Sequence, residues 1–475
     1  MSQSTQVLTV DTELTESLLP GFTDFMIKQY IGRQPQDFSN ISKHEVNGVQ
    51  VLEYDFHMPS ETWEIKTQIE IRKPIRVVLT PIGVVPGAYV ERLKEDIMVG
   101  VHYFEEEMRR RTLYITFSPH EEIGSVHEPG SRGRLRHIFG DSMVNFYILS
   151  IFFSIGLFFV FGAATPIIMI LFQSLLIFFS DRIVARIGDW KLTKDNPTLY
   201  LMQYHLDPDE MKNFEKQITK GIMDQIRTEI FAATFGVGRE VTCDTTRQIF
   251  SRYGIDCRPE NIRVKKIDVY DLVERASRLF GLPIPKISVS NTMAPNAAAT
   301  GVSPGRATVM ITTGAMVQLE DSELLSVLGH EMSHVKSRDP ISLFVITSAE
   351  YLLRVYVFYP IVILLGFFYF LFALGGIYFI GKFFEARCDL ESAMRTGSAE
   401  PMASALRKIG FSRLIFERSP SVRLMDWLSW DPHPPIYFRI SRLEKIKNVK
   451  EIKHPFLTSV KDCIEGVIAS VGSTP

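Results

Sequence analysis

Cysteine is scarce in this chain of 475 residues. Its four cysteines, Cys243, Cys257, Cys388 and Cys463, lie far apart, which excludes the closely spaced pairs of a small disulfide scaffold or of a cysteine-zinc site. We therefore expect reduced thiols on a protein that faces the cytosol.

The chain has no large net charge, and its first residues are not expected to form a secretory signal. The formal charge is only -2, from 52 basic and 54 acidic residues, so nothing favours a nucleic-acid partner. The first twenty residues contain acidic side chains where a secretory signal would have a basic segment followed by an apolar core. Any membrane targeting must come from internal apolar segments, in keeping with a mean hydropathy of +0.07.

No charged residue occurs between Asp141 and Asp181. Because a helical crossing takes about 20 residues, and because Gly162 and Pro166 interrupt the middle of this stretch, we predict a transmembrane hairpin over 142–180. Basic flanks stay in the cytoplasm, so both ends of the hairpin are expected there. The flanking residues are Arg132, Arg134 and Arg136 before it, and Arg182, Arg186, Lys191 and Lys194 after it.

The first hairpin separates soluble regions with different patterns. Residues 1–140 are predicted to form a soluble N-terminal α+β domain of unknown role, and 181–281 a helical linker. A catalytic domain is expected over 282–475, in which Asp321 lies near the start of a helix. Expected strands are Val49–His57, Trp63–Ile71, Leu113–Phe117, Lys286–Ser290 and Ala307–Thr312, with a helix over Tyr89–Arg111.

A metal motif follows in His330-Glu331-Met332-Ser333-His334. Residues four apart lie on one helix face, so His330 and His334 can both direct a ring nitrogen at one zinc ion. Glu331 lies about a hundred degrees around the axis, where it can act on a water without binding the metal. The alternative is a pair of surface histidines on an amphipathic helix.

A catalytic zinc needs a third protein ligand and an open fourth position. Glu385 and Asp389 share one helical face, so Glu385 can bind the ion while Asp389 accepts a hydrogen bond from a ligand histidine. Spacing alone leaves Glu391 and Glu417 as alternatives. Cys388 beside Asp389 is interpreted as a small packed residue, with metal coordination as the alternative.

Four blocks in order make the sequence more specific than the pentapeptide does. Together they resemble the membrane zinc metallopeptidases of the HtpX and CAAX-prenyl-protease family, over about 285–443. The blocks are "APNAAATG" (Ala294 to Gly301), "TTGAMVQLEDSELLSVLGHEMSHVKSRD" (Thr312 to Asp339), "EARCD" (Glu385 to Asp389) and "HPPIYFRI" (His433 to Ile440).

The resemblance implies a gluzincin-type domain with one catalytic Zn2+. In that family the matching residues bind zinc, here His330, His334 and Glu385, and Glu331 is the general base. The resemblance also implies that Asp389 supports a ligand histidine.

Two further blocks have implied roles. The resemblance places Asn296 and Ala297 at a cleft edge that pairs with an extended peptide, and His433 and Arg439 near the metal, where they steady the oxyanion. Relatives usually have an aromatic residue where this chain has Ala386, and alanine where it has Cys388, which alters packing near the site and no ligating atom.

The chain between His334 and Glu385 must leave the metal and return. Two crossings of about 20 residues fit that length, so a second hairpin is predicted over 340–381, with Pro360 at its turn. Lys336 and Arg338 before it and Lys382 after it again indicate cytosolic ends. Glu350 and Arg354 inside it lie four residues apart and either line a water-filled path or pair at a helix interface.

The predicted fold is an α+β integral membrane protein: a mainly α-helical metallopeptidase domain with a small strand edge, four transmembrane helices in two hairpins, and the soluble N-terminal domain. The predicted function is zinc-dependent endopeptidase cleavage of membrane or membrane-proximal proteins, as in HtpX-like quality control. Both termini and the active site are expected on the cytoplasmic side, with a peptide substrate and the lipid bilayer as partners. Alternatives are CAAX-type processing and a non-catalytic, zinc-stabilised scaffold or chaperone.

Overall fold

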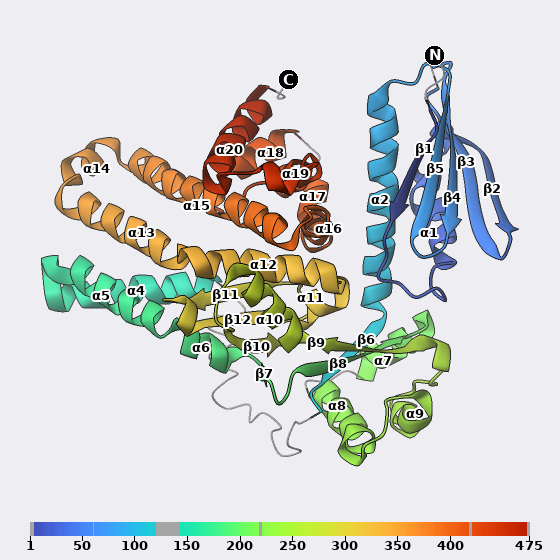
Figure 1. The fold of residues 1–475 in the computed structure, drawn as a ribbon, viewed down its shortest axis with the longest axis horizontal. Coiled ribbons are helices and arrows are strands. Elements are labelled where there is room, and N and C mark those ends of the chain that lie inside the picture. Colours follow the sequence, from blue (N-terminus) through green and yellow to red (C-terminus); the bar gives the residue numbers. More distant parts are fainter. Residues whose placement is uncertain (1–3, 60, 120–142, 218–220, 418–419, 473–475) are drawn as a thin grey trace. The chain divides into compact units, whose positions relative to one another are not determined.

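The computed structural model describes residues 4–59, 61–119, 143–217, 221–417 and 420–472 (Figure 1). The chain divides into two compact units, Met1–Ile115 with Met202–Val264, and Thr116–Leu201 with Lys265–Pro475. The predicted basic flank at Arg132, Arg134 and Arg136 lies outside the described residues.

The first unit contains a five-stranded antiparallel sheet in the order β1-β5-β4-β3-β2. Alternate side chains of β4 and β5 are buried, as in a sheet with one face on a core. The Asn47-Gly48 turn joins β2 to β3 with positive φ at both residues, a conformation these residue types favour. The strands are β1 (Gln6–Val10), β2 (Phe38–Val46), β3 (Val49–His57), β4 (Glu64–Ile71) and β5 (Ile75–Ile82), and the helices that contribute to the same core are α1 (Gly21–Gln29) and α2 (Gly87–Arg110).

The same unit corrects the expectation of four reduced cysteines. Cys243 and Cys257 form a disulfide with their Cα atoms 5.5 Å apart, whereas Cys388 and Cys463 are free and buried. The two cysteines are 14 residues apart in the sequence, and the helix Cys243–Arg252 lies between them. Their pairing depends on how the chain folds after that helix, so no short motif indicates it. The helices here are α7 (Pro208–Gln217), α8 (Ile222–Ala233) and α9 (Cys243–Arg252).

Strands also occur where mainly helix was expected, over 181–281. The order β6-β8-β9 forms one sheet, and β7 joins the sheet of the second unit. The strands within this range are β7 (Trp190–Leu192), β8 (Thr198–His205) and β9 (Ile262–Asp268), whereas β6 (Thr112–Phe117) lies before it, where a strand was predicted.

The second unit is built on a four-stranded sheet in the order β11-β12-β10-β7. The central strands β10 (Lys286–Ser290) and β12 (Ala307–Thr312) are parallel and have the predicted bounds, and β11 (Ala297–Gly301) runs antiparallel at the edge. Val289, Val309 and Ile311 are fully buried, as expected of strands covered on both faces.

Helix α12 (Asp321–Ser337) begins at the predicted residue. Glu320 and Glu323 form a capping box there, and Arg338 ends the helix in the left-handed conformation. The other soluble helices of this unit are α6 (Ser180–Ile187), α10 (Val269–Phe280), α11 (Thr313–Gln318), α16 (Glu400–Ile409), α17 (Phe411–Glu417), α18 (Pro420–Leu428), α19 (Ile436–Glu444) and α20 (Pro455–Gly472).

The apolar segments form two pairs of helices. The helices α4 (Met143–Phe161) and α5 (Thr165–Phe178) fold back on each other. The evidence is that the Phe153 and Phe172 ring centroids are 5.0 Å apart, whereas a straight helix would separate these residues by roughly 28 Å. α13 (Asp339–Tyr356) and α15 (Phe367–Thr396) lie side by side, connected by α14 (Tyr359–Leu365) (Figure 1).

The prediction of four spans is not confirmed. Within the described residues, the stretches Phe152–Phe178 and Phe367–Thr396 are long and apolar enough to cross a membrane, and the pair α13 and α14, bent by 85°, would add a third. Pro360 lies in the first turn of α14, where its missing N–H costs nothing. The chain reverses partly there and partly at Gly366, which has a φ of 54°.

Two charged features of the second hairpin are paired inside the protein. Arg354 Nε lies 3.1 Å from Glu350 Oε1, and the Tyr369 hydroxyl of α15 donates to the same oxygen at 3.3 Å, which matches the helix-interface alternative. Lys382 is fully buried and its Nζ donates to the carbonyl oxygens of Ser429, at 3.2 Å, and Asp431. It is therefore not the exposed flanking charge that its sequence position suggested.

Candidate metal centre

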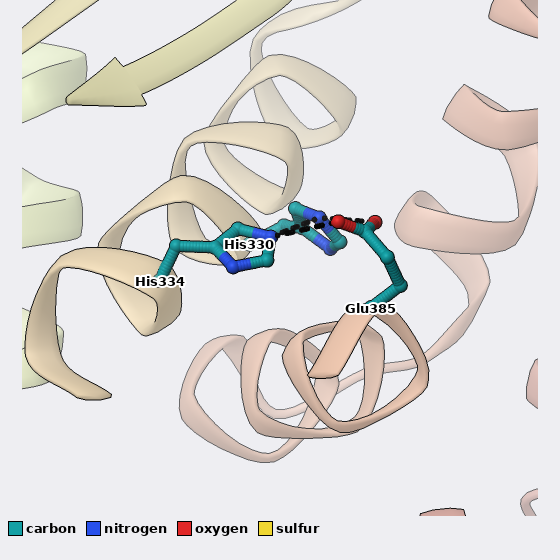
Figure 2. Close-up of side chains that lie close together, drawn as sticks. All are labelled: His330, His334 and Glu385. Atoms are coloured by element: carbon teal, nitrogen blue, oxygen red, sulfur yellow. Dashed lines mark hydrogen bonds and ion pairs between the residues drawn. The ribbon is translucent and has the colours of Figure 1, made fainter. Parts of the chain in front are cut away.

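Three side chains from two helices converge on one another (Figure 2). His330 and His334 project from α12, and Glu385 projects from α15. The two Nε2 atoms are 3.1 Å apart, and they lie 3.3 Å and 3.2 Å from the two carboxylate oxygens of Glu385. The three ligand atoms form a group that can hold a metal ion.

The far side of each imidazole faces a carboxylate. His330 Nδ1 is 2.9 Å from Asp389 Oδ1, and His334 Nδ1 is 2.7 Å from Asp339 Oδ2. A carboxylate at Nδ1 holds a proton there, which leaves the Nε2 lone pair of a neutral imidazole directed at Glu385.

The donor set fits a metal ion. A tetrahedral zinc with bonds of about 2.1 Å separates its ligand atoms by about 3.4 Å, close to the spacings between His330, His334 and Glu385. Glu385 Oε2 is buried and has no hydrogen-bond partner among the described residues, an arrangement that is costly for a carboxylate. An ion among these atoms would supply the missing partner.

Both supporting carboxylates are held by buried arginines. Arg439 donates from Nε and Nη2 to Asp389 at 2.8 Å and 2.7 Å, and Arg387 Nη2 donates to Asp339. Both guanidinium groups are buried. Each ligand histidine therefore ends a chain of arginine, aspartate and imidazole that fixes its ring.

The surroundings favour positive charge between the two rings. Burial lowers the pKa of His330, but the nearby carboxylates of Asp389 and Glu385 outweigh that effect and raise the pKa to about 10. A cluster that holds a proton so firmly is also suited to a divalent cation.

Glu331 lies outside the ligand group, as its position on the helix predicts. Its Oε2 accepts a hydrogen bond from the backbone N–H of Ala299 at 2.8 Å. Ala299 belongs to β11, the edge strand that starts at the predicted Ala297. The Glu331 carboxylate thus extends from α12, the helix that also carries His330 and His334, to the edge strand β11.

Known proteins match the region that contains these residues. The family model "Peptidase family M48" matches residues 264–447. A "Protease HtpX homolog" of Moorella thermoacetica is 37% identical over 172 residues, which cover 30% of this chain and 55% of that protein. A "Protease HtpX homolog 2" of Methanosarcina acetivorans is 30% identical over 215 residues, 38% of this chain and 72% of that protein. The chain belongs to peptidase family M48.

Membership of family M48 indicates a hydrolase of the metalloprotease class. It confirms the resemblance to HtpX-type membrane metallopeptidases that the four sequence blocks predicted. The match spans about half the length of the Moorella thermoacetica protein, and the first 263 residues of the chain lie outside the M48 match.

His433 and Arg439, the two residues predicted to steady the oxyanion, both lie near Glu385 of the candidate metal centre. His433 is 48% exposed; its Nδ1 is 2.8 Å from Asp431 Oδ1, and its Nε2 is 3.7 Å from Glu385 Oε2. Arg439 Nη2 is also 3.7 Å from Glu385 Oε2, although its main contact is with Asp389. His433 is thus the more accessible of the two.

The residues considered as alternative ligands have other contacts. Glu391 Oε2 accepts from the Ser333 hydroxyl at 2.7 Å, and Glu417 accepts from the backbone N–H groups that begin α19. Cys388 is buried against Asp339, on the Nδ1 side of His334.

The sequence did not reveal the contacts of Asp339 and Arg387 at the candidate metal centre, or the buried contacts of Lys382. Asp339 follows His334 by five residues, a spacing that no helix face brings together. The left-handed Arg338 turns the chain and makes the contact possible. Arg387, a charge flanked by buried Ala386 and Cys388, was the one available signal of an internal ion pair.

Proposed function

We propose that the chain is a membrane-embedded, zinc-dependent endopeptidase that cleaves membrane or membrane-proximal proteins. One observation supports this most strongly: His330, His334 and Glu385 converge while Glu331, next to the first histidine, is left free of the ligand group and faces a strand edge. A purely structural metal site has no use for a base in that position.

The proposed chemistry is hydrolysis of a peptide bond. When bound, zinc would supply a Lewis acid that polarises the scissile carbonyl and acidifies the attacking water. Glu331 would take a proton from that water and deliver it to the leaving amine. Asp389 and Asp339 would keep the imidazoles of His330 and His334 in one tautomer.

The substrate would bind as an added strand on β11. In an antiparallel edge strand, alternate residues direct their N–H and C=O groups away from the sheet. Ala299 N–H points to Glu331, so Ala297, two residues earlier, presents its groups on the same outer edge. We propose that a peptide pairs there beside Asn296 and Ala297, which brings its scissile bond to Glu331.

His433 would stabilise the negative charge that develops on the carbonyl oxygen. Its exposed Nε2 faces the ligand group, and Asp431 orients the ring through Nδ1. Arg439 remains a second candidate through its positive charge, although its contacts with Asp389 favour a positioning role. One donor of this kind typically contributes about 3 kcal/mol to the reaction barrier.

The proposed setting is a multi-pass membrane protein with four spans. α4, α5 and the two limbs of the second hairpin would be the spans, and the active site would lie on the cytoplasmic side. The basic residues after α5 support this orientation. Quality control of membrane proteins is the proposed role.

The test compares wild type with Glu331→Gln in detergent. Both proteins should retain one zinc per chain, measured by elemental analysis, and only wild type should cleave an unfolded membrane-protein substrate. Ser404→Ala, distant in sequence from the ligands, serves as a folded control. Normal cleavage of the substrate by Glu331→Gln would contradict the mechanism. If neither wild type nor Glu331→Gln cleaves the substrate, the scaffold alternative is favoured.

CAAX-type processing is the competing enzymatic role. A prenylated C-terminal peptide and an unprenylated membrane substrate, offered in equal amounts, separate the two. Faster cleavage of the prenylated peptide would favour processing.

A further inference from the structure

A cavity of about 530 Å³ lies in the second unit between α6, strand β7 and the segment that leads into β10. Its lining brings together residues far apart in the sequence. Among them are Arg182, Arg186, Lys191, Lys194 and Lys286, with Tyr270. We call this cavity the basic pocket.

The positive charge of the basic pocket is largely uncompensated. Lys286 Nζ pairs with buried Asp181 at 2.9 Å, but within the described residues the other four cations, Arg182, Arg186, Lys191 and Lys194, form no ion pair and are exposed. Among the residues that the structure describes, no acidic side chain lines the cavity. In a chain with a formal charge of -2, this local excess is a specific feature and not a consequence of composition.

Apart from Thr193, the rest of the lining is apolar. Ala185, Leu192, Ile284, Pro285 and Ile287 form it, and Ile284 is 39% exposed. A site for a free inorganic anion has no need of such a wall, whereas a ligand with an anionic group and an attached apolar part would use both surfaces.

The basic pocket also lies at the end of an apolar membrane segment. α5 ends at Phe178, and α6, which contributes Arg182 and Arg186, begins at Ser180 and packs against β10 and β12 (Figure 1). Phe178 and Phe179 are both exposed, and Arg182 stacks over the Phe179 ring with 5.6 Å between its Cζ and the ring centroid. In the proposed membrane setting, in which α5 is a span, these cations would lie at the depth of the lipid phosphates.

We propose that the basic pocket binds the phosphate of an anionic phospholipid headgroup. Arg182 and Arg186 would approach it from α6, and Lys191 and Lys194 from β7 and the loop after it, while the apolar wall contacts the glycerol and upper acyl chain. The site is separate from the metal centre and does not depend on the proposed peptidase activity.

The experiment uses the full chain in nonionic detergent with a fluorescent short-chain phosphatidylglycerol, read by anisotropy. The variant Arg186→Gln/Lys194→Gln removes two unpaired cations from the pocket. Its matched control, Lys447→Gln/Lys450→Gln, removes two exposed lysines elsewhere in the same unit. Unlabelled phosphatidylglycerol, phosphatidylcholine, inorganic phosphate and a poly-glutamate peptide serve as competitors.

We expect the pocket variant to lose roughly thirtyfold in affinity, at about tenfold per 1.4 kcal/mol and about 1 kcal/mol for each basic residue near lipid phosphates. The control should bind like wild type, and only unlabelled phosphatidylglycerol should compete strongly. Equal losses in both variants, or none in either, would overturn the proposal. Equal competition by inorganic phosphate would reassign the pocket to a free anion, and stronger competition by poly-glutamate to an acidic protein segment. Unchanged thermal unfolding of both variants shows that a loss of binding is not a loss of fold.

Discussion

Asp339 is predicted to set the metal affinity of the candidate centre although it lies outside the group of His330, His334 and Glu385. Its Oδ2 lies 2.7 Å from His334 Nδ1, it is 3% exposed, and the same oxygen accepts from Arg387. Asp339→Asn keeps the shape and removes the charge. The imidazole then loses the partner that fixes its tautomer, and Arg387 stays buried without its carboxylate.

Two effects of different size follow. Loss of a carboxylate that supports a ligand histidine typically costs about 10- to 100-fold in metal affinity, so we expect the zinc dissociation constant to rise by that factor. Breaking a buried ion pair by removing one partner typically costs about 3 to 5 kcal/mol. The unfolding free energy of Asp339→Asn should therefore fall by about 3 kcal/mol.

The assay is competition for zinc with a chromophoric chelator, at a temperature where circular dichroism shows the variant to be folded. Glu391→Gln is the matched control. Its carboxylate lies 4.0 Å from Arg387 Nε and accepts from Ser333, but it touches no histidine. A dissociation constant that is unchanged in Asp339→Asn, or raised equally in Glu391→Gln, would refute the reasoning.

Three further variants test other parts of the chain. His433→Gln should lower the single-turnover rate constant by about 10²- to 10³-fold with zinc content unchanged. An unchanged rate constant would exclude an oxyanion role. Burial raises the pKa of Glu417 to about 7, although two backbone hydrogen bonds act to lower it. Ionisation of Glu417 therefore destabilises the fold. Wild type should then lose unfolding free energy as pH rises from about 4.5 to about 7, while Glu417→Gln should not, and parallel urea-unfolding series would contradict this. Cys243→Ser should cost about 3 kcal/mol, because it opens a loop of 14 residues; a reductant should weaken wild type alone, and equal sensitivity of both proteins would count against the disulfide.

Features encoded within a few residues could be predicted from the sequence. Strand β3 and the parallel strands β10 and β12 have their predicted bounds because their apolar patterns and flanking breaks are local. Helix α12 starts at Asp321 because its capping box lies within one turn. The histidines four residues apart follow directly from helix geometry.

Features that depend on distant contacts could not be predicted in this way. Lys382 followed an apolar run and was interpreted as a flanking charge, but carbonyl oxygens nearly fifty residues away bind it. The disulfide and Arg387 were hidden for the same reason. In each case the sequence shows the chemical group and not its partner, because the partner comes from another element.

The metal centre and the second hairpin are one mechanical unit. α13 begins at Asp339, which touches His334, and α15 returns to bring Glu385 to the same group. Tyr369 of α15 donates to Glu350 of α13, and Arg354 of α13 lies over the Phe370 ring of α15 with 5.0 Å between its Cζ and the ring centroid, so α13 and α15 are held together along the hairpin as well as at the site. Because Asp339 stands at one end of the hairpin and Glu385 at the other, a displacement of the hairpin would move a candidate ligand and the support of another together. The apolar hairpin therefore contributes to the geometry of the candidate metal centre.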